Sequence, residues 1–420
     1  MLTPQPISPA TEQRNARLLY IELAWMAIPF AMEWYYLQVY AIRLNATPLH
    51  LGLLISGRAF LLVVGNSLAH QWQRRYPNAI RALSGPVFLS RFLLYMAIAL
   101  TPFLQGLQVE TLIALVVLSA IPQGISQGIF LAMLPIAVGK DSLANVVAQR
   151  STLMNLTILP AVFVAGQTLQ WVAVPLNYQI GFTLAFAASF MSWWNIRRIT
   201  IPDQVKVEVQ HNDPQPIRVW TYLPFRRLAL VAAAVNISVF MAGPVNPLRL
   251  VRELNATDGW ISLFAVFEMG AGAVLTLFMP QLLRRMNMRW LIITTILIMA
   301  VQPFILALTA TLPPHIIGSI AFGLGWFAIN VLLYNRMVEL IPSEHLPPFA
   351  AAYQAVINFS LFLGPLIGTF LIENVMTLPA ALLVIGGLRL GAGILAWAIR
   401  TEPTLAALVH PAVETVQSPL

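Results

Sequence analysis

The segment LNATPLHLGLLISGRAFLLVVGNSLAHQWQRR, residues 44–75, recurs in outline at residues 254–285. Both copies open with Leu-Asn-Ala-Thr, continue through an apolar run, and close with Gln and then an Arg pair. They lie 210 residues apart, which is half of the 420-residue chain. Agreement at both ends of the segment, at the half-length offset, indicates two copies of one structural unit. We therefore expect the functional site to lie between the copies.

The composition is typical of an integral membrane protein. Hydrophobic residues make up 58% of the chain and charged residues 10%, whereas soluble domains are about 25% charged. The net charge of +8 does not indicate a nucleic-acid partner, because the basic residues fall mostly between apolar segments and act as topology signals. The chain has no cysteine, which excludes disulfides and cysteine-based metal sites.

Twelve apolar segments are each long enough to cross a hydrocarbon core of about 30 Å as a helix. Six fall in each half, so we expect an all-α membrane protein of two parallel six-helix bundles, related by a pseudo-two-fold axis along the membrane normal. The expected spans are 18–42, 50–70, 82–104, 111–138, 151–172, 177–197, 228–249, 259–281, 289–310, 314–338, 349–372 and 378–399.

The distribution of Lys and Arg predicts the orientation. Eighteen of these residues fall on one side of the expected spans, and only Arg43, Arg249 and Arg252 fall on the other. Positive charge marks the cytoplasmic side, so we expect both termini in the cytoplasm and a multi-pass protein of the inner (plasma) membrane. The expected parts are a cytoplasmic segment 1–17, bundles 18–199 and 227–400, a cytoplasmic linker 200–226 and a cytoplasmic tail 401–420.

The residues after the second span carry a recognisable motif. They read Asn66-Ser67-Leu68-Ala69-His70-Gln71-Trp72-Gln73-Arg74-Arg75. This resembles the loop motif Gly-x-Leu-Ala-Asp-Arg-x-Gly-Arg-Arg of the major facilitator superfamily of secondary transporters. His70 replaces the acidic residue and both glycines are absent, while the second copy keeps only its Arg pair, Arg284 and Arg285. With the parallel 6+6 spans and the central loop, the resemblance covers nearly the whole chain.

The resemblance implies transport by alternating access and a gating role for the loop-motif residues. Within the superfamily, the chain is most similar to the drug/proton antiporter-like members. Gly364-Pro365-Leu366-Ile367-Gly368 in span 11 is a family-like signature, although span 5 has only Leu159-Pro160-Ala161 and Gly166. The loop-motif candidates are His70, Arg74, Arg75, Arg284 and Arg285.

Charged residues inside the expected spans are candidates for function, because burying a charge in a bilayer costs free energy. Glu33 and Arg58 lie at matching depth on consecutive spans, which predicts an ion pair. The pair is either a static packing element or part of proton coupling. Glu268 occupies the repeat position of Arg58 and has no Lys or Arg in its own span. We prefer it slightly over Glu33 as a proton site.

Three other charged residues in the spans have expected structural roles. Arg91 and Arg389 lie near mid-depth in spans 3 and 12, which the resemblance makes peripheral, so we expect each to bond carbonyls or a carboxylate in its own half. An anion-binding role for them stays open. Glu22 lies near the cytoplasmic end of span 1, where we expect it to reach headgroup water.

Polar residues recur at helical spacing on the spans that line the cavity in the superfamily. The alternative is that these amides and aromatic side chains only hold helices together in lipid. Gly323, Gly325, Gly364 and Gly368 are expected to allow close helix approach. The substrate-cavity candidates are Tyr36, Ser119, Gln123, Gln127, Asn236, Trp326, Asn330, Tyr334 and Asn358.

The leading hypothesis is proton-coupled export of small, amphipathic organic molecules by a transporter that is not an enzyme. The chain has no Walker motif for ATP and no clustered metal ligands, so no cofactor or metal is expected. The expected partners are the lipid bilayer, a small-molecule substrate and protons, with no nucleic acid, and we expect a monomer. One alternative is an uptake porter for sugar-, nucleoside- or peptide-like solutes. The other is a non-transporting scaffold or assembly factor on the same fold.

Overall fold

The computed structural model describes residues 8–76, 78–201, 219–341 and 345–399. These residues are helical apart from short connections. Most of the expected linker and all of the expected tail lie outside the described residues.

The N-terminal half contains six crossings, two of which are interrupted by π-helical turns. The first is α1, η1 and α2, and the third is α4 and η2. The bounds are α1 Pro9–Ala31, η1 Met32–Tyr36, α2 Leu37–Arg43, α3 Pro48–Gln73, α4 Ala79–Arg91, η2 Phe92–Ala97, η3 Thr101–Phe103, α5 Gln108–Val138, α6 Lys140–Leu169 and α7 Leu176–Arg197.

The C-terminal half contains the other six crossings. A π-helical turn, η5, continues the first of them at its far end. The bounds are η4 Val219–Thr221, α8 Leu223–Leu248, η5 Arg249–Glu253, α9 Asp258–Arg285, α10 Met288–Leu308, α11 His315–Leu340, α12 Leu346–Asn374 and α13 Leu378–Ala398.

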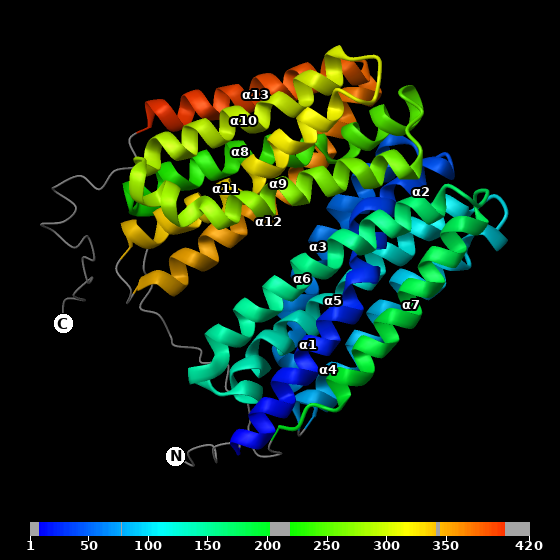
Figure 1. Cartoon of the computed structure of the whole chain (residues 1–420), viewed down its shortest axis with the longest axis vertical. Helices are drawn as coiled ribbons and strands as arrows, with labels where there is room; N and C mark the ends of the chain where they lie inside the picture. Colours follow the sequence, from blue (N-terminus) through cyan, green and yellow to red (C-terminus); the bar gives the residue numbers. More distant parts are fainter. Residues whose placement is uncertain (1–7, 77, 202–218, 342–344, 400–420) are drawn as a thin grey trace, which may run out of the picture.

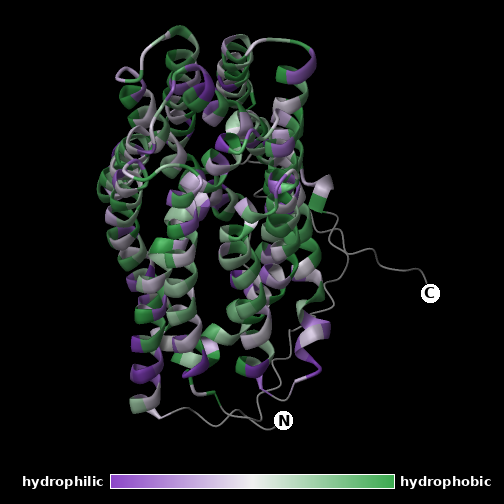
Figure 2. Cartoon of the chain, turned by 90° about the vertical axis from the view of Figure 1, so that its right-hand side faces the viewer, coloured by the Kyte–Doolittle hydropathy of each residue, from purple (hydrophilic) through white to green (hydrophobic). Residues whose placement is uncertain are grey.

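The expected all-α architecture with six crossings in each half is confirmed. Within the described residues, nine helices are long and apolar enough to cross a membrane. Hydrophobic residues predominate along the helices, and hydrophilic ones gather at several helix ends (Figure 2). Two helices begin nine or more residues earlier than expected: α1 at Pro9 instead of residue 18, and α6 at Lys140 instead of residue 151. Hydropathy detects only the apolar part of a helix, whereas Ser8 caps the polar start of α1 by accepting a hydrogen bond from the Thr11 amide.

The sequence repeat is also a repeat of local geometry. Asn45 and Asn255 both have left-handed backbones, with φ of 67° and 53°. The threonine two residues later caps the following helix in both copies, α3 in one half and α9 in the other. Each copy therefore ends one helix and starts the next in the same way, which confirms two copies of one structural unit.

The two halves share a hydrophobic core at one end only. The largest core cluster combines residues of both halves, including Tyr36 and Leu51 with Val245 and Ala265. The other two clusters each belong to a single half. Figure 1 shows the same asymmetry, because the two bundles meet near α2 and diverge away from it. We call the end with residues 44–47 and 254–257 the joined end, and the opposite end, where α1 begins and α13 ends, the divergent end.

Hydrogen bonds between the halves gather at the joined end. Arg43 donates to the carbonyl of Ala256 at 3.1 Å and lies 3.5 Å from the Asp258 carboxylate. Arg252 donates to the carbonyl of Ala46. The two alanines occupy the same position of the repeat, so each half receives an arginine of the other. We call this pair the reciprocal Arg–carbonyl contacts.

Candidate functional site

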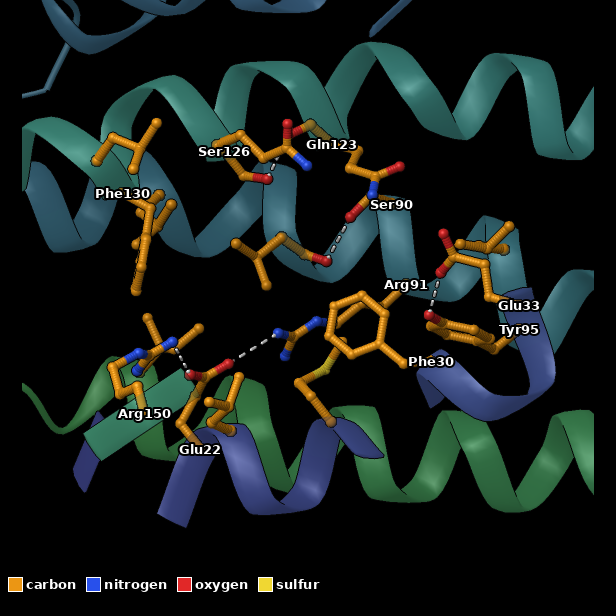
Figure 3. Close-up of a pocket in the computed structure, with 18 residues that line it drawn as sticks. Glu22, Phe30, Glu33, Ser90, Arg91, Tyr95, Gln123, Ser126, Phe130 and Arg150 are labelled. Carbon is orange, nitrogen blue, oxygen red and sulfur yellow. Dashed lines mark hydrogen bonds and ion pairs between the residues drawn. The ribbon is translucent and has the colours of Figure 1, made fainter. Parts of the chain in front are cut away.

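The first cavity lies inside the N-terminal half, lined mainly by α1, η1, α4, η2 and α5, and has a volume of about 360 Å³. Charged groups gather at two places along its wall (Figure 3). Glu22 and Arg150 lie at one side, Glu33 and Tyr95 at the other, and Phe30 between them. An apolar wall with a few oriented polar groups is typical of sites for small organic molecules.

Glu33 forms the centre of a polar network across the first four crossings. Its carboxylate pairs with Arg58 of α3, as the matching depths predict, and accepts a hydrogen bond of 2.7 Å from Tyr95. Arg58 also donates to the side-chain oxygen of Gln123 at 3.0 Å. Glu33 and Tyr95 both lie in π-helical turns, η1 and η2, an irregularity that often occurs at functional sites.

The expectation that Glu22 reaches headgroup water is wrong. Glu22 is 4% exposed, and its carboxylate lies 3.0 Å from the guanidinium of Arg150 and 3.6 Å from that of Arg91. It also accepts a hydrogen bond of 2.8 Å from Ser192. Because α1 begins at Pro9, Glu22 lies more than three turns into the helix, where packed neighbours replace water.

Arg91 and Arg389 have the structural contacts that the sequence predicts. Arg91 donates to the carbonyl of Ser189 at 2.7 Å, besides its ion pair with Glu22. Arg389 donates to the carbonyl of Met299 at 2.8 Å and lies 5.3 Å from the centre of the Phe322 ring. Each bonds within its own half.

The second cavity lies at the joined end, where the first crossing meets the C-terminal half, and has a volume of about 150 Å³. It is lined by residues of η1, α2, α8, η5, α9, α10 and α11. Glu268 of α9 lines it and makes no ion pair with any described residue. The polar side chains that line it are Tyr35, Gln38, Asn246, Glu268, Gln302, His315 and Ser319.

Comparison with known proteins identifies the fold. The model of the Major Facilitator Superfamily matches residues 228–419. A solved variant of the nucleoside transporter NupG superposes with a TM-score of 0.75 at 10% identity, over 91% of this chain and 99% of that one. A bacterial metal transporter superposes with a TM-score of 0.68 at 15% identity, over 93% and 99%. The family model thus matches the C-terminal half, and the whole chain has the fold of these transporters.

Two further matches are also to transporters. A bacterial homologue of the iron transporter ferroportin in its inward-facing state has a TM-score of 0.66 at 16% identity, over 93% of this chain and 99% of that one. The MFS-type transporter TOXA of Cochliobolus carbonum is 25% identical over 126 residues, which are 30% of this chain and 23% of that protein. At such low sequence identity the superposed structures show the fold alone, so the substrate has to be inferred from the site.

The cavity candidates on the N-terminal half divide into two groups. Gln123 and Gln127 line the first cavity. Ser119 is fully buried and donates to the Val116 carbonyl of its own helix, and Tyr36 donates to the Val162 carbonyl of α6. Ser119 therefore bonds within its own helix and Tyr36 bonds to a neighbouring helix, and neither residue lines a cavity.

The C-terminal candidates lie outside both cavities. Asn236 is buried and donates to the Ala232 carbonyl, and Asn358 accepts from Gln354. Asn330 donates to the Trp326 carbonyl, while Tyr334 is 48% exposed. The equally spaced residues Trp326, Asn330 and Tyr334 therefore lie on a partly exposed face of α11 that lines neither cavity.

The loop-motif residues of the superfamily lie at the divergent end of α3 and α9. His70 lies in the last turn of α3, Arg74 follows that helix, and α9 ends with Arg284 and Arg285. Arg75 lies 5.9 Å from the centre of the Trp72 ring. No ion pair among the described residues includes them, in keeping with the replacement of the acidic residue by His70.

Several residues of the two cavities were not anticipated from the sequence. His315, which the expected span 314–338 includes but which was not a site candidate, is 2% exposed at the start of α11. Gln302 is the single amide in the apolar helix α10, which is a usable signal. The contacts of Tyr95 and Arg150 could not be predicted in this way, because their partners Glu33 and Glu22 are 62 and 128 residues away in the sequence.

Proposed function

We propose that this protein is a secondary transporter that moves small, amphipathic organic molecules across the inner (plasma) membrane by alternating access. The observation that carries the proposal is the asymmetry of the two halves. They share a core and hydrogen bonds at the joined end, and have separate cores toward the divergent end. Alternating access requires this kind of arrangement, in which one bundle rocks against the other around a central site.

The charge distribution supports the orientation of this conformation. The three basic residues opposed to the other eighteen, Arg43, Arg249 and Arg252, lie at the joined end. With positive charge on the cytoplasmic side, the joined end is extracellular and both termini are cytoplasmic. The conformation is then the inward-facing one, in which a cytoplasmic solute reaches the site.

Proton coupling is assigned to Glu268, with Glu33 as the second candidate. Arg58 holds Glu33 in an ion pair, whereas Glu268 has no ion-pair partner among the described residues. A carboxyl group without a fixed cation can exchange a proton as the bundles move. Tyr35 and His315 line the same cavity, and Arg389 lies near enough to act on Glu268 electrostatically.

The test is proton movement in proteoliposomes that contain a pH-sensitive dye. The purified protein is challenged with lipophilic cations, sugars, nucleosides and peptides, and we expect substrate and protons to move in opposite directions. Glu268→Gln is expected to abolish the substrate-dependent pH change. Glu339→Gln is the matched control, because this carboxylate is half exposed and lines neither cavity.

Each of the other possible outcomes would contradict a different part of the proposal. Co-movement of substrate and protons would indicate an uptake porter. Transport without any pH change would remove proton coupling. If folded protein moves none of these compounds, a non-transporting scaffold or assembly factor would be the better interpretation.

A further inference from the structure

The second cavity contains polar groups that lack partners. Gln302 and His315 are 4% and 2% exposed, yet Gln302 Oε1 and His315 Nδ1 have no hydrogen-bond partner. The same holds for Gln38 Oε1 and Asn246 Oδ1. Ten buried side-chain atoms of the described residues lack a partner, and four of them belong to residues that line this small cavity.

Such a concentration indicates an occupant. An unsatisfied buried polar group costs free energy, so native proteins pair such groups with protein, water or a ligand. Water can fill a polar cavity of this size. A ligand that bonds several of these atoms at once would replace that water.

The charge of the side chains that line the cavity indicates the sign of the charge on the ligand. Among the described residues that line the cavity, Glu268 alone has a charged side chain. Nη1 of Arg389 donates to the Met299 carbonyl, and the guanidinium lies 5.3 Å from the centre of the Phe322 ring. Arg389 acts on Glu268 electrostatically but is not part of the lining. The first cavity differs, because its carboxylates Glu22 and Glu33 already have arginine partners.

The chemistry of the donors and acceptors narrows the ligand further. An ionised carboxylate only accepts hydrogen bonds, and amide oxygens accept as well. A ligand with several N–H donors and a positive charge therefore complements Glu268, Gln302 and Asn246 together. The aromatic rings of Trp34 and Phe264 also line the cavity and attract cations through their faces.

We propose that the second cavity binds a small primary ammonium ion, with Glu268 as its counter-ion and the amides of Gln302 and Asn246 as further acceptors. The inference rests on the proposed function in one respect, since the ammonium group would belong to the transported solute. The binding site itself can be tested without transport.

The experiment is calorimetric titration of the purified full chain in detergent with n-propylammonium. Parallel titrations use 1-propanol, propionate and tetramethylammonium. We expect saturable binding of n-propylammonium alone, because the alcohol lacks the charge, the anion has the wrong sign and tetramethylammonium has no N–H donor. Glu268→Gln should weaken binding about tenfold or more, since it removes a charge-assisted hydrogen bond.

Two further variants keep the test decisive if Glu268→Gln does not fold. Gln302→Met should weaken binding several-fold, because it keeps the side-chain size and removes the acceptor. Asn236→Leu is the matched control: this buried amide also has an unpartnered oxygen on α8 but does not line the cavity, so binding should be unchanged.

The outcomes separate the site from the transport proposal. Equal binding of 1-propanol, or no saturable binding of n-propylammonium, would overturn the site and leave a water-filled cavity. Full affinity in Gln302→Met and Glu268→Gln would do the same. Binding of n-propylammonium by a protein that transports neither this ion nor any compound of the proteoliposome panel would refute the proposed function and leave the site standing.

Discussion

Asn45 and Asn255 show how single residues define the repeated unit. Both have positive φ, a conformation that asparagine tolerates better than most residues with a side chain. Both side chains are exposed, so their role is conformational and not a matter of packing. The helical segment that precedes each asparagine ends two residues before it, at Arg43 or Glu253, and the chain then turns into the next helix.

Replacement of Asn255 tests this conformational role. Asn255→Val should reduce the free energy of unfolding by about 1–2 kcal/mol, because a β-branched side chain clashes with the backbone at positive φ. Asn255→Gly should be close to neutral, since glycine adopts this conformation freely. Thermal unfolding of the two variants in detergent makes the measurement, and equal stability would contradict the assignment.

The Glu33–Arg58 pair is the second feature that belongs to the residue scale. Glu33→Gln or Arg58→Leu alone should destabilise the protein by about 3–5 kcal/mol, because each leaves an uncompensated buried charge. The double variant should be more stable than the sum of the two losses predicts. Equilibrium unfolding of the four proteins measures the coupling, and strictly additive losses would show that the pair is not energetically linked.

Helix contacts in the C-terminal half depend on glycines, as their positions in the sequence predict. A Cβ on Gly323 of α11 would lie 1.9 Å from the Glu268 carbonyl oxygen of α9, and one on Gly368 would lie 2.3 Å from the Met241 carbonyl oxygen. Gly325 and Gly364 are similarly confined. The close approach of α9 and α11 places Glu268 and His315 at the same cavity.

Alanine substitutions test the contact between these elements. Gly323→Ala should destabilise the protein by about 1–3 kcal/mol, because α11 must move away from α9. Gly391→Ala on α13 is the matched control, since nothing lies within 4 Å of the added Cβ, and it should be neutral or stabilising by about 0.5–1 kcal/mol. Similar thermal stabilities of the two variants would refute the close contact.

At the scale of the whole molecule, the reciprocal Arg–carbonyl contacts join the two halves at one end. Removing both arginines should shift the population toward conformations in which the joined end separates, because the closed arrangement loses interactions that the separated one does not have. The absence of native cysteines lets spin labels report this directly.

The measurement is the distance between labels on cysteines at Leu49 and Val375, which are exposed at the joined end, and at Tyr76 and Met286 near the divergent end. With Arg43→Ala and Arg252→Ala combined, we expect longer distances for the first pair and shorter distances for the second. Arg289→Ala is the control, because its contact with the Trp397 carbonyl lies within one half. Unchanged distributions would show that these contacts do not decide the conformation.

The sequence was sufficient to predict the architecture and one ion pair. Apolar runs long enough to cross a bilayer specify helices, because a backbone in lipid has to satisfy its own hydrogen bonds. The repeat at half the chain length specifies two equivalent bundles. Glu33 and Arg58 could be paired because consecutive helices place residues at calculable depths.

The composition of the cavities followed only from the tertiary structure. Glu22 meets Arg91 and Arg150 through helices that are distant in sequence, and Gln302 and His315 line one cavity from different helices. Helical spacing gives the face of a residue but not the helix that packs on it, so Tyr36 and Ser119 could not be distinguished from Gln123. Rotation and contact of helices arise from packing among all twelve crossings, which no single segment of sequence specifies.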